Sequence, residues 1–182
     1  ISLASKLKRN DLTVSLQGEY ANNDIRGSFY GRHQQTIDNH ICMQHIAPNC
    51  SSNEIFRGLV DGQANAVFNG RIHIHPNAQK TLAELSNKNL LLSSTATINT
   101  TPELEIYADD VRCSHGATVG QINSEALFYL QSRGIPRVEA KRLLSLAFIA
   151  EIVEQLPYNS VREFVTQRSS SLLSSLHHEG ER

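Results

Sequence analysis

The stretch "ADDVRCSHGATVGQ", residues 108–121, holds the residues best suited to chemistry in this chain. It places Cys113 and His115 two positions apart, just before a glycine-containing break. A thiolate and an imidazole are soft and borderline metal ligands, and a cysteine with a histidine can also act as a nucleophile and its base. In an extended chain the two side chains point to the same face. The pair therefore indicates a ligand set, a nucleophilic site, or two packed side chains.

Packing is the simplest interpretation of this pair from its spacing alone. Free cysteine is among the most buried residue types, so Val111 and Cys113 would face the core while His115 closes the end of the strand. A structural zinc site needs four ligands, and no second pair nearby supplies the other two. A transient site shared with another chain needs fewer ligands from this one.

Two other candidate groups predict less chemistry. His73 and His75 form an HxH pair on one strand face, and such pairs bind metals. Arg71 has the same parity, however, and a fixed cation opposes a dication, so a solvated polar face is the preferred interpretation. Asp109 and Asp110 are adjacent and would point opposite ways in a strand, which makes them poor partners for acid–base catalysis on one atom. They are interpreted as a turn that precedes the last strand.

The remaining histidines and the known sequence motifs add no site. His33, His40 and His45 match no ligand spacing. The patterns GxxxxGK[ST], GxGxxG and GxSxG do not occur, and these are the usual signatures of phosphate loops, dinucleotide folds and hydrolase nucleophiles. The chain therefore has no visible means of binding ATP or a dinucleotide by itself, and no catalytic residue is predicted.

The composition is that of a soluble globular protein. Hydrophobic residues make up 40% and charged residues 19% of the 182 positions, and the formal net charge is -1. This balance argues against nucleic-acid binding driven by bulk charge. No run approaches the roughly 20 apolar residues of a membrane span. The three cysteines lack CxxC spacing, which fits a reducing cytoplasm. The start at Ile1 leads us to expect that N-terminal sequence is missing.

The elements that would position Cys113 and His115 are short strands. Alternating apolar residues before Asn123 indicate strands buried on one side; their apolar members include Leu12, Val14, Leu16, Ile25, Phe29, Ile37, Ile41, Ile72, Ile74, Leu104 and Ile106. A sandwich, a barrel and a solenoid all remain open. The pairs Asp61-Gly62 and Asn69-Gly70 are hairpin signals, whereas the polar ladder "SNKNLLLSSTATINT" suits stacked coils.

The chain changes to a helical period after Asn123. We expect one helix over Ser124–Ser132 ending before Gly134, a second from Pro136 to Leu156, and a third beginning at Ser160, where Ser160 and Glu163 match a capping box. This change of period predicts two domains, 1–122 with a β architecture and 123–182 with a helical one.

A long stretch of the chain resembles a known family. The segments "NKNLLLSS" and "PELEIYADDVRCSHGATVGQINSEALFYLQSRGI", followed by a long apolar helix, resemble the SufB/SufD family of iron–sulfur cluster assembly proteins, and "ADDVRCSHGAT" favours its SufD branch. The resemblance runs from about Phe56 to Leu156. It implies a mainly β fold, a right-handed parallel β-helix (β-solenoid) followed by a small C-terminal α-helical subdomain.

The resemblance also implies a role and partners. It implies a non-catalytic cytoplasmic scaffold that pairs its terminal strand with a SufB-like protein and docks a SufC-like ABC-type ATPase on its helices. His115 would contribute, with the SufB-like partner, to a nascent iron–sulfur cluster at their interface, and Cys113 is its neighbour on the same strand face. No cofactor would be bound stably by this chain, and no nucleic acid or membrane partner is expected.

Two alternatives remain open at this point. A β-helix carbohydrate-active enzyme would use His73, His75 and nearby acids, although Glu103 and Glu105 are few for a catalytic groove. A purely structural dimerisation module would simply pack Cys113 and His115, and a homodimer through the end strands is expected when the natural partner is missing.

Overall fold

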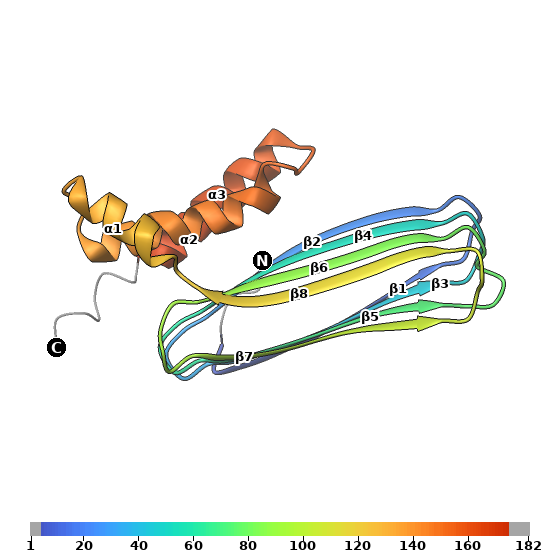
Figure 1. The fold of residues 1–182 in the computed structure, drawn as a ribbon. Helices are drawn as coiled ribbons and strands as arrows, with labels where there is room; N and C mark the ends of the chain where they lie inside the picture. Colours follow the sequence, from blue (N-terminus) through green and yellow to red (C-terminus); the bar gives the residue numbers. More distant parts are fainter. Residues whose placement is uncertain (1–4, 175–182) are drawn as a thin grey trace.

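The computed structural model describes residues 5–174, which form a parallel β-solenoid followed by three helices (Figure 1). Strands of ten residues alternate between two sheets, ordered β1-β3-β5-β7 and β2-β4-β6-β8, and all neighbours are parallel. The strands are β1 (Leu7–Leu16), β2 (Asn22–Gly31), β3 (Thr36–His45), β4 (Ser51–Val60), β5 (Asn65–Ile74), β6 (Leu82–Leu91), β7 (Thr97–Ile106) and β8 (Arg112–Gln121). The predicted mainly β solenoid with a helical C-terminal part is confirmed.

Each coil of the solenoid consists of two strands and two turns and places like side chains above one another. Partners in neighbouring coils are 29 residues apart early in the chain and up to 32 residues apart later. Asn10 Nδ2 donates to Asn39 Oδ1 at 2.7 Å, and Asn22 Nδ2 donates to the Ser51 hydroxyl at 2.7 Å. Such polar ladders satisfy side chains that a simple amphipathic pattern leaves unexplained.

The hairpin signals in the sequence were wrong. Asp61-Gly62 does form a turn, with Gly62 at φ +63, but it joins β4 to β5, which lie in different sheets. Asn69-Gly70 lies inside β5. A Cβ at Gly70 would approach Leu85 within 2.6 Å, so this glycine makes room in the core rather than at a turn.

The solenoid interior is closely packed around aromatic rings. Phe68 stacks on Phe29 with ring centroids 6.5 Å apart and contacts Phe56 at 4.9 Å. Gly27 and Gly58 lie beside these rings, and a Cβ at either position would collide with Phe56 or Phe29 respectively. Close approach, rather than unusual backbone torsion, is the reason for glycine at these two strand positions.

Three helices follow the solenoid: α1 (Ser124–Ser132), α2 (Arg137–Val153) and α3 (Asn159–Ser174). Figure 1 shows them on the side of the β2-β4-β6-β8 sheet. The side chain of Asn123 accepts from the Ala126 amide at 2.8 Å and caps α1. The third helix starts one residue before the expected Ser160. No helix among residues 5–174 has the length and apolar character needed to cross a bilayer. The division into domains 1–122 and 123–182 stays a prediction.

A buried arginine attaches α2 to the sheet. Arg57 on β4 has a side chain only 3% exposed, and it donates to Glu151 of α2 through Nη2 at 3.0 Å and Nε at 3.2 Å. This contact lowers the pKa of Glu151. A two-point pair between a guanidinium and a carboxylate fixes orientation as well as distance. It therefore helps to hold the helices in one position on the solenoid.

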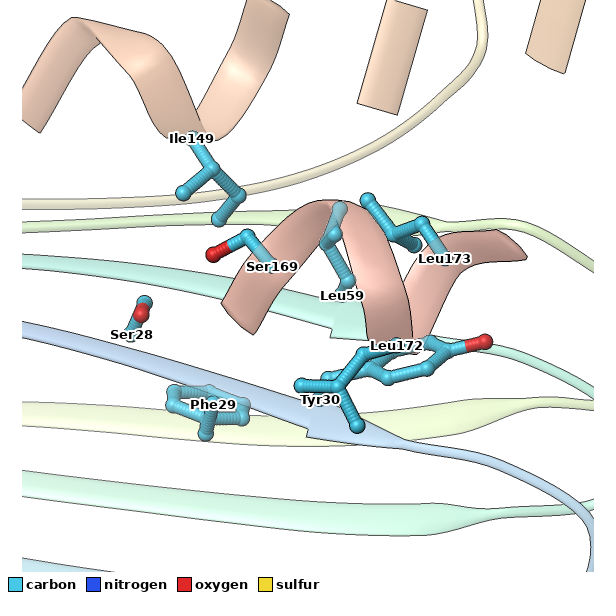
Figure 2. Close-up of a pocket in the computed structure, with 8 residues that line it drawn as sticks. All are labelled: Ser28, Phe29, Tyr30, Leu59, Ile149, Ser169, Leu172 and Leu173. Carbon is cyan, nitrogen blue, oxygen red and sulfur yellow. The ribbon is translucent and has the colours of Figure 1, made fainter. Parts of the chain in front are cut away.

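Apolar side chains complete this contact between the helices and the sheet. Figure 2 shows Leu172 and Leu173 of α3 close to Tyr30 of β2 and Leu59 of β4, with Ile149 of α2 nearby. The hollow that remains between them is only about 20 Å³, which is about the room that one water molecule needs. Because helices cover its outer face, β4 has buried residues in succession from Phe56 to Val60, and the strand therefore lacks clear alternation in the sequence.

Two ionisable side chains are fully buried inside the solenoid. His45 Nε2 lies 2.9 Å from the Ser52 hydroxyl, and burial lowers the pKa of His45 to about 4. Neither carboxyl oxygen of Glu54 has a hydrogen-bond partner among the described residues, and burial raises the pKa of Glu54 to about 7. Burial therefore favours the neutral form of each group, which His45 keeps above about pH 4 and Glu54 keeps below about pH 7.

These two pKa shifts have opposite effects on stability. The folded pKa of Glu54 lies above its ordinary value of 4.5, so its contribution is present below pH 4.5 and is lost as the pH rises through about 7. The folded pKa of His45 lies below 6.5, so its contribution is present above pH 6.5 and is lost as the pH falls through about 4. Between pH 4.5 and pH 6.5, the fall in unfolding free energy that Glu54 causes and the rise that His45 causes largely cancel.

We predict that Glu54→Gln removes the fall in stability with rising pH that Glu54 causes and leaves the effect of His45 unchanged. Relative to the wild type, the variant should gain unfolding free energy on the order of 3 kcal/mol between pH 4.5 and pH 8, because its amide does not ionise. Urea unfolding across this pH range measures the difference. The exposed Glu84→Gln on β6 is the matched control. Parallel curves for wild type and Glu54→Gln would contradict the assignment.

Candidate functional site at the last coil

The last coil of the described solenoid ends in an open strand edge. Within residues 5–174, β8 pairs with β6 alone, so its second edge carries backbone donors and acceptors without a neighbouring strand. Figure 1 shows β7 and β8 at this end of the stack. An exposed strand edge is a template for pairing with another chain.

The register shows where Cys113 and His115 point. Cys113 lies beside Ala83 of β6, and His115 lies beside Leu85. Ala83 and Leu85 are buried and belong to the solenoid core. Cys113 and His115 therefore share the inward direction of their row, as their spacing predicts. Because no further described coil covers them, Cys113 is only half-buried and His115 is exposed.

The environment of Cys113 favours the neutral thiol. Burial is the main cause and raises the pKa of Cys113, while a hydrogen bond with the backbone of Ala83 acts in the opposite direction. A buried, uncharged setting of this kind makes a thiol inert rather than nucleophilic. Metal coordination would have to displace the proton. This setting favours a ligand or a packed side chain over a nucleophile.

The described residues do not form a complete metal site. No group of three or more His, Cys, Asp or Glu side chains among residues 5–174 could hold a metal ion. Two ligands on an open edge are half of a tetrahedral set. A metal or cluster held at Cys113 and His115 would therefore need further ligands from another molecule.

The other sequence candidates lie elsewhere. His73 Nδ1 is 2.5 Å from Glu105 Oε2, and Arg71 also contacts Glu105 at 3.5 Å. On the outer face of the β1-β3-β5-β7 sheet, His73 thus belongs to an ion-pair network, and the His75 ring lies against it with centroids 4.4 Å apart. Asp110 lies in the turn before β8, where its carboxylate pairs with Lys80 at 2.8 Å.

The three histidines whose spacing in the sequence matches no metal-ligand pattern also lie apart from one another. His33 lies in a turn with φ 57, His40 pairs with Asp38 at 2.8 Å on the outer face, and His45 lies in the interior. The structure does not bring them together.

The sequence analysis missed a contact on the same outer face. Arg71 Nη2 lies 3.6 Å from the Cys42 sulfur, and Cys42 is half-buried. The two residues are 29 positions apart, which is the coil repeat in this part of the chain. A search for side chains at that offset would have found the pair, but the repeat varies too much in length to be visible beforehand.

Comparison with known proteins places the chain in a family. The family model "SUF system FeS cluster assembly, SufBD core domain" matches residues 1–148. The chain is 37% identical to the iron-sulfur cluster assembly protein SufD of Escherichia coli over 91% of its length. It is 39% identical to the SufBD family protein slr0076 of Synechocystis over 89%, and 33% identical to the chloroplastic protein ABCI7 of Arabidopsis thaliana over 95%. It spans 39%, 36% and 37% of these relatives respectively, well under half of each.

We predict that Cys113 reacts slowly with iodoacetamide at pH 7. Its raised pKa leaves little thiolate, and each unit of pKa lowers the thiolate fraction about tenfold. The rate should climb steeply above pH 9. Peptide mapping by mass spectrometry gives the rate for this cysteine, and the same chain in denaturant is the control. Equal rates in the folded and denatured chain would contradict the burial argument.

Proposed function

Because the chain belongs to the SufBD family of iron–sulfur cluster assembly proteins, we propose that it is a non-catalytic scaffold subunit of the Suf assembly complex. The observation that carries this proposal is the position of Cys113 and His115 in the inward row beside the open edge of β8. A SufB-like partner that adds its own terminal strand to this edge would cover both side chains. Backbone hydrogen bonds would supply affinity, and the paired rows would bring ligands from two chains together.

The nascent cluster is the cargo of this site rather than a resident cofactor. A thiolate and an imidazole are both established ligands of iron–sulfur clusters. His115, which is the more exposed of the two, is the main contribution of this chain, and Cys113 gives its proton up on coordination. Incomplete coordination by one chain also suits assembly, because a cluster held by few ligands can be passed on.

A SufC-like ABC-type ATPase would dock on the helices. Val161 and Phe164 are three positions apart in α3 and are 42% and 67% exposed, and Tyr158 directly before the helix is 69% exposed. Residues three apart lie on one helical face. A grouped set of exposed apolar side chains is typical of a protein contact. The partner would hydrolyse ATP, since this chain carries no nucleotide-binding motif.

The free cysteines support a reducing compartment for this complex. Cys42, Cys50 and Cys113 are all free thiols. Unpaired thiols and a nascent iron–sulfur cluster both suit a reducing compartment. We therefore propose a cytoplasmic location.

The alternatives gain little support from the geometry. Glu105 and Asp38, two acids on the outer face of the β1-β3-β5-β7 sheet, are engaged in ion pairs with His73 and with Arg9 and His40 respectively. A carbohydrate-active site would need a pair of carboxylates facing one another across a groove. Pairing of β8 with a second copy of the chain is the remaining alternative.

We predict that His115→Ala lowers cluster build-up by about tenfold or more when the full-length protein is reconstituted with its SufB-like and SufC-like partners, because even groups that only orient a metal ligand alter affinity by 10–100-fold. Iron and sulfide retained per complex are the measurements. His73→Ala is the control on the opposite sheet, and gel filtration reports assembly. Unchanged build-up would remove His115 from the site, and a stable homodimer that excludes the SufB-like protein would favour the dimerisation module.

We also predict that Phe164→Ala weakens binding of the SufC-like ATPase about tenfold, because removal of a central apolar anchor costs an interface about 1–2 kcal/mol. Calorimetry measures the affinity. Glu163→Gln is the matched control, since it changes an exposed neighbour on the same helix without removing apolar area. Equal affinity of wild type and Phe164→Ala would place the ATPase elsewhere.

A further inference from the structure

The outer face of the β1-β3-β5-β7 sheet holds a cysteine in direct contact with a cation. Cys42 on β3 lies between Thr13 of β1 and Arg71 of β5 in the register, and Glu103 of β7 follows in the same row. Arg71 Nη2 donates toward the Cys42 sulfur at 3.6 Å. The largest cause of the raised pKa of Arg71 is this contact with Cys42. A cysteine next to arginine and partly open to solvent is the setting in which thiols react.

Arg71 is the cation in contact with the Cys42 sulfur, and the other charged groups around that sulfur have partners of their own. On β1, Asp11 accepts from Arg9 at 2.9 Å. The other neighbours are also engaged: His40 on the same strand pairs with Asp38 at 2.8 Å, and Glu103 on β7 accepts from Asn69 at 3.1 Å. Arg71 itself is held from its far side by Glu105 at 3.5 Å.

Space for a small molecule is present above this contact. A hollow of about 370 Å³ lies on the sheet surface, and polar side chains supply most of its lining: Asp11, Thr13, His40, Cys42, Asn69, Arg71 and Glu103. The volume falls within the range of small-molecule sites in proteins.

The other two cysteines lack this combination. Cys50 is buried, and its sulfur is directed at the Gly18 carbonyl oxygen at 3.2 Å. Cys113 is half-buried, and its pKa is raised by burial. Since all three cysteines lie within the described residues, Cys42 is the one thiol of the chain that has both partial exposure and a guanidinium contact.

We propose that Cys42, Arg71 and the hollow above them form a thiol-modification site for small anionic disulfides, of which glutathione disulfide is the test case. The Cys42 thiolate attacks one sulfur of the disulfide and forms a new S–S bond. The original S–S bond breaks, and the second sulfur leaves as a thiolate. Sulfur atoms and electrons balance without a further oxidant, because the disulfide is itself the oxidant.

Arg71 has a role both before and after this exchange. Before it, the guanidinium lies 3.6 Å from the attacking sulfur and attracts an anionic reagent. After it, the sulfur is neutral, and the guanidinium is released to bind a carboxylate of the added group, a geometry that suits arginine. The modification adds a bulky anion to the face opposite the β2-β4-β6-β8 sheet. It therefore stands independently of the site at Cys113 and His115.

The test exposes the chain to glutathione disulfide at pH 7 and follows each cysteine by peptide mass spectrometry. Cys42 should become modified at least about tenfold faster than Cys113. Cys42→Ser should abolish the fast modification. Arg71→Gln should slow it about tenfold, and Arg71→Lys should restore part of the rate, because it keeps a charge. Arg9→Gln is the matched control, since it removes an arginine from the same sheet face without touching the sulfur.

A second reagent separates anion recognition from simple thiol exposure. Arg71→Gln should slow the reaction with glutathione disulfide more than the reaction with the uncharged hydroxyethyl disulfide. Faster modification of Cys113 or Cys50 than of Cys42 would overturn the proposal. So would equal rates for Arg71→Gln and Arg9→Gln, or the same slowing for the charged and uncharged disulfides.

Discussion

Stacking of parallel strands in register is the interaction on which the rest of this molecule depends. Each of the strands β3 to β6 hydrogen-bonds to the strand one coil before and one coil after it, whereas the first and last strands of each sheet have one such partner. Inside the stack, an inward side chain is therefore covered by a coil on each side. Ala83 and Leu85 meet this condition, whereas Cys113 and His115, one coil further on in the same rows, do not. The same inward direction that makes a residue part of the core inside the stack makes it a ligand candidate at its open end.

The helices divide the outer surface into two unlike faces. On the β2-β4-β6-β8 sheet, α2 and α3 cover the strands, and the Arg57 side chain is almost fully buried against Glu151. On the β1-β3-β5-β7 sheet, the outer rows stay open to solvent and carry ion pairs. Charged residues thus anchor the helices on one face of the solenoid, and other charged residues form a polar network on the opposite face. The contact between Arg71 and Cys42 is accessible because it lies on the second face.

Burial shifts the two ionisable groups of the interior toward their neutral forms. His45 is neutral above about pH 4 and Glu54 below about pH 7, because the interior solvates either charge poorly. Glu54 lies in the row of Leu85 and Ile25, so its neighbours within the sheet are apolar. No alternation of apolar and polar residues signals such a carboxyl, because the sequence pattern shows parity and not what lies across the core. The burial of Glu54 depends on the packing of the two sheets face to face.

How far the sequence predicts this protein differs from one element to another. Strands with one solvated face, such as β5, show alternating side chains, and the shared face of Cys113 and His115 followed from their spacing alone. The strand β4 was not predicted, because helices bury its outer face and remove the alternation from Phe56 to Val60. Local sequence determined strand and helix identity and side-chain parity, since these depend on neighbouring residues. Only the tertiary structure decided that Cys42 meets Arg71 and that Cys113 and His115 lie at an uncovered end, because coil register joins residues about thirty positions apart.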